Sequence, residues 1–61
     1  PYFFMARTYA REGKSAKALK ELEKAINRGL DDPSIIENDP WMATLHPFPE
    51  YQRLVNKISG F

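Results

Sequence analysis

One glycine, Gly13, separates two stretches with helical periodicity near the start of the chain. Within each stretch, apolar and small residues recur at intervals of three and four, which is the pattern of an amphipathic helix. The residues on these two stripes are Tyr2, Met5, Ala6 and Tyr9 before the glycine, and Ala18, Leu19, Leu22, Ala25 and Ile26 after it. Residues 12–15 are too few to form more than a tight turn. The sequence therefore predicts two helices that run antiparallel as a helical hairpin.

The order of residue types along this hairpin resembles the tetratricopeptide (TPR) repeat. In that family an aromatic residue, a Leu-Gly pair, a tyrosine, a turn glycine and two alanines recur at this spacing. The corresponding residues here are Tyr2, Met5, Ala6, Tyr9, Gly13, Ala18, Leu22 and Ala25. Leu22 replaces an aromatic residue, and Leu30 stands where the family has proline, with Pro33 three residues later.

Two alanines explain this pattern through helix packing, without reference to the family. Ala6 and Ala18 are small at the expected crossing of the two helices, so the backbones can approach closely, and Tyr2, Tyr9 and Leu22 fill the rest of the seam. An unrelated helical hairpin whose alanines fall here by chance is the alternative.

Glycine and proline positions predict the ends of the helices. The first helix is expected over 2–11, and the second from a Ser15 cap to about Arg28, with Gly29 in the left-handed conformation after it. Its polar face is expected to be solvated and holds Lys17, Lys20, Glu21, Glu23, Lys24 and Asn27. Asp32-Pro33 and Asp39-Pro40 each place a cap before a first-turn proline, which predicts short helices over 33–38 and 40–45.

The last part of the chain is expected to cover the hairpin. Residues 46–49 contain two prolines and should be extended, because a residue before proline avoids the α region. A final helix should run from Pro49 to about Ile58 and be broken by Gly60. The residues expected to be buried in this part are Ile35, Ile36, Trp41, Met42, Leu45, Phe48, Tyr51, Leu54, Val55 and Ile58, with Trp41 against the second helix.

This tail resembles the end unit of many bacterial TPR arrays, which often lies at the C-terminus of peptidases, hydrolases, cyclases or protein kinases. The matching residues are Gly29, Asp32, Asp39, Pro40, Leu45, Pro49, Tyr51 and Leu54. The family usually has an acidic cap before the last proline, where this chain has Phe48. The two resemblances imply one all-α domain over 1–61, with a TPR-like hairpin at 1–30 and a C-terminal capping segment at 31–61. We expect it to be part of a longer bacterial protein.

Composition excludes several kinds of site. The 61 residues include no cysteine, so disulfides and thiolate metal sites are excluded, and the net charge of +1 implies no strong electrostatic partner. No apolar run reaches the ~20 residues that span a bilayer. His46 is the only histidine, and Asp31-Asp32 lack the spacing of a calcium loop. We therefore predict no catalytic residue, metal or cofactor, and neither a nucleic-acid nor a membrane partner.

Three hypotheses for function follow. The first is a protein-interaction module, the terminal unit of a TPR array, whose partner is a protein, a peptide or the rest of its own chain. The second is an accessory helical domain that regulates or positions an upstream enzyme domain. The third is a small nucleic-acid-binding domain, and the mixed charges disfavour it. Its basic patch would be Arg7, Arg11, Lys14, Lys17 and Lys20.

The resemblance to TPR repeats also suggests where a ligand would bind. Family members bind peptides along the groove lined by the first helix of each repeat. The corresponding positions here are Phe3, Arg7 and Arg11, with Ala10 beside them, and they suit an acidic peptide. For Phe3 and Phe4 three interpretations stay open: cover by a preceding repeat, a groove that faces a ligand, or chance.

Overall fold

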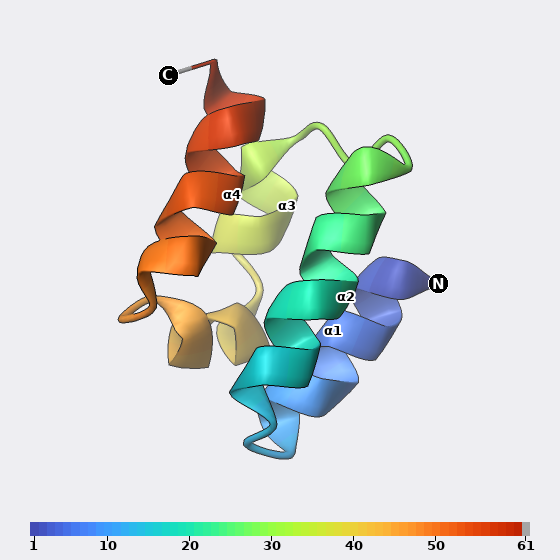
Figure 1. The fold of residues 1–61 in the computed structure, drawn as a ribbon, viewed down its shortest axis with the longest axis vertical. Helices are drawn as coiled ribbons and strands as arrows, with labels where there is room; N and C mark the ends of the chain where they lie inside the picture. The colour runs from blue at the N-terminus through green and yellow to red at the C-terminus, as the bar shows by residue number, and fades with distance from the viewer. Residues whose placement is uncertain (61) are drawn as a thin grey trace.

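The computed structural model describes residues 1–60, and these form an all-α fold without a strand, as predicted. The elements follow one another with short connections (Figure 1). In chain order they are α1 (Tyr2–Arg11), α2 (Ser15–Asn27), α3 (Pro33–Glu37), the 3-10 helix η1 (Pro40–Leu45) and α4 (Pro49–Ser59).

Helices α1 and α2 lie side by side and run in opposite directions (Figure 1). The turn between them depends on Gly13, whose φ of 77° is in the left-handed region that favours glycine. Two hydrogen bonds close the end of α1: the Gly13 N–H donates to Ala10 O at 3.1 Å, and the Lys14 N–H to Tyr9 O at 2.9 Å. This pair is a Schellman motif, which satisfies carbonyls at the end of a helix.

The end of α2 repeats the same motif. The Gly29 N–H donates to Ile26 O at 3.1 Å, and the Leu30 N–H to Ala25 O at 3.0 Å. Gly29 has a φ of 118°, so its predicted left-handed conformation is confirmed. The beginning of α2 differs from the prediction. Ser15 is the first residue within the helix, Lys14 precedes it, and no side chain caps it.

The predicted aspartate caps of the two short helices are confirmed. Asp32 Oδ1 accepts a hydrogen bond from the Ser34 N–H at 3.0 Å, and Asp39 Oδ1 accepts one from the Trp41 N–H at 2.8 Å. Each aspartate precedes a proline that lacks an N–H, so the cap bonds the next free donor. The aspartates therefore fix where α3 and η1 begin.

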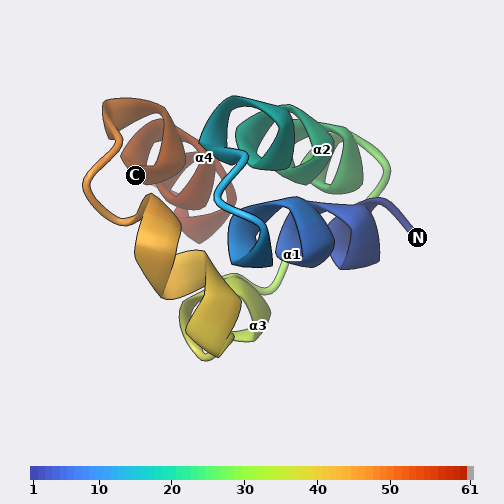
Figure 2. The ribbon, with the colours of Figure 1, turned by 90° about the horizontal axis from the view of Figure 1, so that it is seen from below.

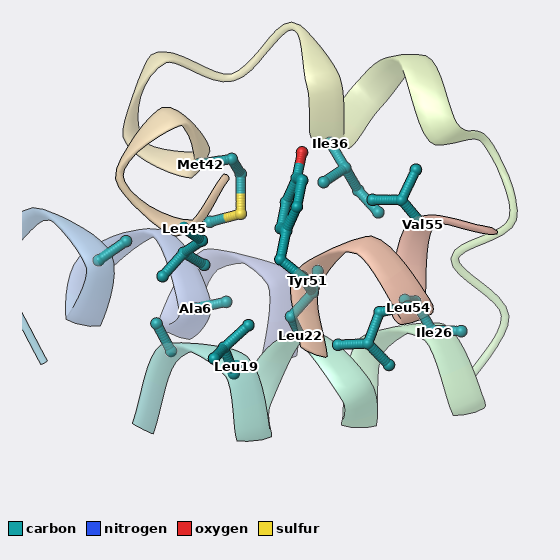
Figure 3. Close-up of a cluster of buried hydrophobic side chains, with 12 residues drawn as sticks. Ala6, Leu19, Leu22, Ile26, Ile36, Met42, Leu45, Tyr51, Leu54 and Val55 are labelled. Carbon is teal, nitrogen blue, oxygen red and sulfur yellow. The ribbon is translucent and has the colours of Figure 1, made fainter. Parts of the chain in front are cut away.

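The C-terminal segment covers both helices of the hairpin. η1 packs against α1, while α4 packs against α2 (Figure 2). A single hydrophobic core joins all five elements (Figure 3). Its buried residues are Ala6, Ala10, Ala18, Leu19, Leu22, Ile26, Ile36, Met42, Leu45, Tyr51, Leu54 and Val55. Ala6 and Ala18 are both 0% exposed, in keeping with a close approach of α1 and α2.

Several burial predictions in the C-terminal segment are wrong. Ile35, Trp41 and Phe48 are exposed, although all three were expected in the core. α3 and η1 are so short that each buries only one side, and Ile36, Met42 and Leu45 occupy it. Phe48, which stands where the TPR end unit usually has an acidic cap, is therefore an aromatic residue on the surface.

Residues 46–49 are extended only in part. His46 has φ −52° and ψ −39°, which is the α region, and its N–H donates to Ala43 O at 3.3 Å. It continues the turn of η1, so local hydrogen bonding overrides the preference of a residue before proline. Of the two residues that precede a proline, only Phe48, with φ −85° and ψ 126°, has the predicted extended backbone.

On the hairpin, the buried stripe is rotated relative to the prediction. Ala10 and Glu21 are buried, although both were assigned to outer faces, and Met5 is exposed. Glu21 Oε2 lies 3.1 Å from Lys24 Nζ, so its charge is paired at the edge of the core. On α1 the rotation follows from η1, which packs along one side of this helix and shifts its buried stripe toward that side.

Candidate binding surface

The outward side of α1 carries residues at helical spacing that meet one side chain from η1. Phe4, Arg7, Thr8 and Arg11 are separated by three or four residues and therefore share one face. Together with Trp41 they line a shallow surface depression of about 160 Å³. We call it the α1–η1 depression. It exists only because η1 packs against α1 and brings Trp41 beside a helix thirty residues earlier in the chain.

An ion pair holds the two sides of this depression together. Arg7 Nε pairs with Asp39 Oδ2, and the other oxygen of the same carboxylate caps η1 at Trp41. The Asp39 side chain is only 9% exposed, whereas the Arg7 side chain is 36% exposed. One carboxylate therefore both starts η1 and joins it to α1. The position of Trp41 depends on this contact.

Arg11 differs from Arg7 in its partners. Its guanidinium lies over the Trp41 ring, with the guanidinium carbon 5.8 Å from the ring centroid. A cation–π contact of this kind leaves the N–H groups at the edge of the guanidinium free to donate. Phe4, which is 66% exposed, lies on the same face of α1. The depression thus combines apolar aromatic surface with a guanidinium that can bind a carboxylate.

The structure brings together only two of the residues predicted for the binding surface. Arg7 and Arg11 both line the depression, but Phe3 does not. Phe3 packs against the core and lines a different hollow beside Arg28 and Leu30. Ala10 is 3% exposed and cannot contact a ligand. The α1–η1 depression therefore shares Arg7 and Arg11 with the predicted stripe and adds Phe4 and Thr8, while a binding role for Phe3 stays a prediction.

The α1 part of the depression could be predicted from the sequence. Phe4, Arg7, Thr8 and Arg11 follow the spacing i, i+3, i+4 and i+7, which describes one helical face better than steps of four alone. Trp41 gave no comparable signal. Its place beside α1 depends on how η1 docks, which is a contact between distant parts of the chain.

The third hypothesis named a basic patch whose members turn out to have different surroundings. Arg7 pairs with Asp39, Lys14 Nζ lies 3.6 Å from Glu12 Oε1, and Lys17 Nζ lies 5.7 Å from the centre of the Tyr9 ring. With Arg11 over Trp41 included, contacts within the chain engage four of the five cations that this hypothesis requires.

His46, the only histidine, packs against an aromatic ring. Its ring centroid lies 5.0 Å from that of Tyr51. The two side chains, with Glu37, Gln52 and Val55, line a hollow of about 240 Å³ between the C-terminal elements. Within residues 1–60, no three histidine or carboxylate side chains gather as a metal site would need.

Comparisons with protein-family models, with curated proteins and with solved structures gave no match. Among the helices of residues 1–60, none combines the length and apolar character that crossing a membrane requires.

Proposed function

We propose that this chain is a protein-interaction module, the terminal unit of a TPR array, which binds a peptide segment at the α1–η1 depression. One observation carries the proposal: two aromatic side chains and an exposed guanidinium converge there from separate elements. Aromatic residues and arginine are the types that contribute most binding energy in protein interfaces. Phe4 and Trp41 are both large apolar side chains that stay exposed in the folded chain.

The packing of the hairpin supports the TPR part of the proposal. Ala6 and Ala18, which stand for small residues of the repeat, are fully buried in the core shared by α1 and α2. Terminal repeats of a solenoid need a cap over their last apolar face. The segment from α3 to α4 supplies such a cover, because Ile36, Leu45 and Leu54 from its three elements join the same core.

The chemistry of the depression indicates an acidic partner segment with an apolar side chain. Arg11 can donate two parallel hydrogen bonds to a carboxylate, and the apolar side chain can lie on Phe4 and Trp41. The depression is shallow and small compared with a stable protein interface, so a single segment should bind weakly. Neighbouring repeats would strengthen binding by adding area.

An NMR titration tests this function. The ¹⁵N-labelled chain is titrated with the blocked peptide acetyl-Leu-Ala-Glu-Ala-Glu-amide, and acetyl-Leu-Ala-Gln-Ala-Gln-amide is the uncharged control. We expect saturable shifts at Phe4, Thr8, Arg11 and the Trp41 indole, and much weaker effects from the control. Shifts confined to the outer face of α2, over 17–24, would show that the surface is wrongly assigned.

A further inference from the structure

Asp39 is an acidic residue of this chain that pairs with Arg7, one of the residues that line the α1–η1 depression. Its carboxylate pairs with Arg7 from a position 32 residues later in the chain, while the remaining ion pairs among the described residues join neighbours on a single element or turn. Arg7 and Arg11 lie four residues apart on α1, about 6 Å along the helix axis. The depression therefore contains two guanidinium groups, of which the chain itself neutralises one.

The spacing of Arg7 and Arg11 indicates which acidic segment they would bind if neither arginine were paired within the chain. In an extended peptide, residues i and i+2 point to the same side and lie about 6.5 Å apart. A Glu-x-Glu segment would thus present two carboxylates at nearly the spacing of Arg7 and Arg11. With Asp39 in place, the second carboxylate would lie beside a carboxylate of the chain, and like charges repel.

We propose that Asp39 acts as an internal competitor at Arg7, so that the depression pairs with only one carboxylate of a partner segment and gains nothing from a second. This inference rests on the proposed function, because it concerns which acidic segments the same surface accepts. The carboxylate of Asp39 takes the place of a ligand's second carboxylate at Arg7. Arg11, whose guanidinium lies over Trp41, is left to pair with the partner.

The decisive variant is Asp39→Asn. Asparagine caps a helix about as well as aspartate, so the bond to the Trp41 N–H and the start of η1 should persist while the charge at Arg7 is removed. Asp32→Asn is the matched control, because Asp32 caps α3 in the same way but bonds only Ser34. Asp39→Ser, which also keeps a capping oxygen without a charge, is a second test if the asparagine variant does not fold.

The measurement compares two blocked peptides, acetyl-Leu-Ala-Glu-Ala-Glu-amide and acetyl-Leu-Ala-Gln-Ala-Glu-amide, by NMR titration at one ionic strength. The natural chain and Asp32→Asn should bind both within about twofold. Asp39→Asn should favour the two-glutamate peptide about three- to fivefold, as expected for one exposed ion pair. An unchanged preference in Asp39→Asn and Asp39→Ser, or an equal change in Asp32→Asn, would overturn the inference.

Failure of the inference can be told apart from failure of the proposed function. If the natural chain binds both peptides and the Asp39 variants show no new preference, only the role of Asp39 is wrong. If the natural chain binds neither peptide but Asp39→Asn binds the two-glutamate peptide at α1, the competition is real and the proposed function of the natural chain is wrong. If no variant binds, both are wrong.

Discussion

Tyr51 buries a hydroxyl group that has no hydrogen-bond partner within residues 1–60. Its ring stands between Met42 and Ile36 in the core (Figure 3), and its oxygen is inaccessible to solvent. Burial raises the pKa of Tyr51 above its ordinary value, and the negative charge of Glu37 raises this pKa further. The neutral phenol is thus the form that the fold accommodates.

The raised pKa of Tyr51 predicts a loss of stability in alkali. The folded state holds the phenol proton more tightly than the unfolded state does, so the free energy of unfolding is unaffected by this group below about pH 10. It should fall as the pH rises from there through the folded-state pKa. Urea unfolding at several alkaline pH values measures this loss, and Tyr51→Phe should reduce it. An identical alkaline loss in Tyr51→Phe would contradict the assignment.

A second prediction concerns the stability of Tyr51→Phe at neutral pH. Because the hydroxyl of Tyr51 forms no hydrogen bond with the described part of the chain, Tyr51→Phe removes a buried polar group there without leaving a partner unsatisfied. We expect the free energy of unfolding to stay within about 1 kcal/mol of the natural value or to rise. A loss of several kcal/mol would indicate that the hydroxyl has a partner in solution.

Two large apolar residues of η1, Trp41 and Leu45, should differ sharply in their contribution to the free energy of unfolding. Leu45 is 0% exposed, so Leu45→Ala should lower the free energy of unfolding by about 2–5 kcal/mol through cavity formation. Trp41 is 38% exposed, so Trp41→Ala should lower the free energy of unfolding by only about 1 kcal/mol. Thermal unfolding followed by circular dichroism compares them. Equal losses would mean that Trp41 is a core residue after all.

The crossing of α1 and α2 is the element contact that a single substitution tests most clearly. Ala18 is fully buried, in the same core cluster as Ala6 and Ala10 of α1. Ala18→Leu should overpack the crossing and lower stability by about 1–3 kcal/mol. Ala16→Leu is the control, because Ala16 is exposed on α2. If Ala18→Leu is as stable as the control in thermal unfolding, the two helices do not approach closely there.

The elements themselves were largely predictable from local signals. Gly13 and Gly29 marked the ends of α1 and α2, and aspartate-proline pairs marked the starts of α3 and η1. These residues act on backbone conformation within a few positions, so their effect can be read from the sequence. His46 shows the limit, because its hydrogen bond to Ala43 overrides a local preference.

At the scale of the whole molecule, the sequence predicted which segments are helical but not how the C-terminal segment docks. Trp41 was expected on α2, yet η1 packs against α1 and Trp41 lies over Arg11. Hydrophobic periodicity gives the face of a helix, whereas the partner of that face depends on contacts between distant residues. The candidate site was predicted in part for the same reason: Arg7 and Arg11 belong to one helix, and Trp41 comes from another.

The affinity of an Arg11 variant tests the proposed binding surface most directly. Arg11→Gln keeps most of the side-chain length and removes the charge over Trp41, while Arg53→Gln removes an exposed arginine of α4 outside the depression. We expect Arg11→Gln to weaken binding of acetyl-Leu-Ala-Gln-Ala-Glu-amide about fivefold or more, and Arg53→Gln to leave it unchanged. Equal affinities for the two variants in NMR titrations would contradict a binding surface at the α1–η1 depression.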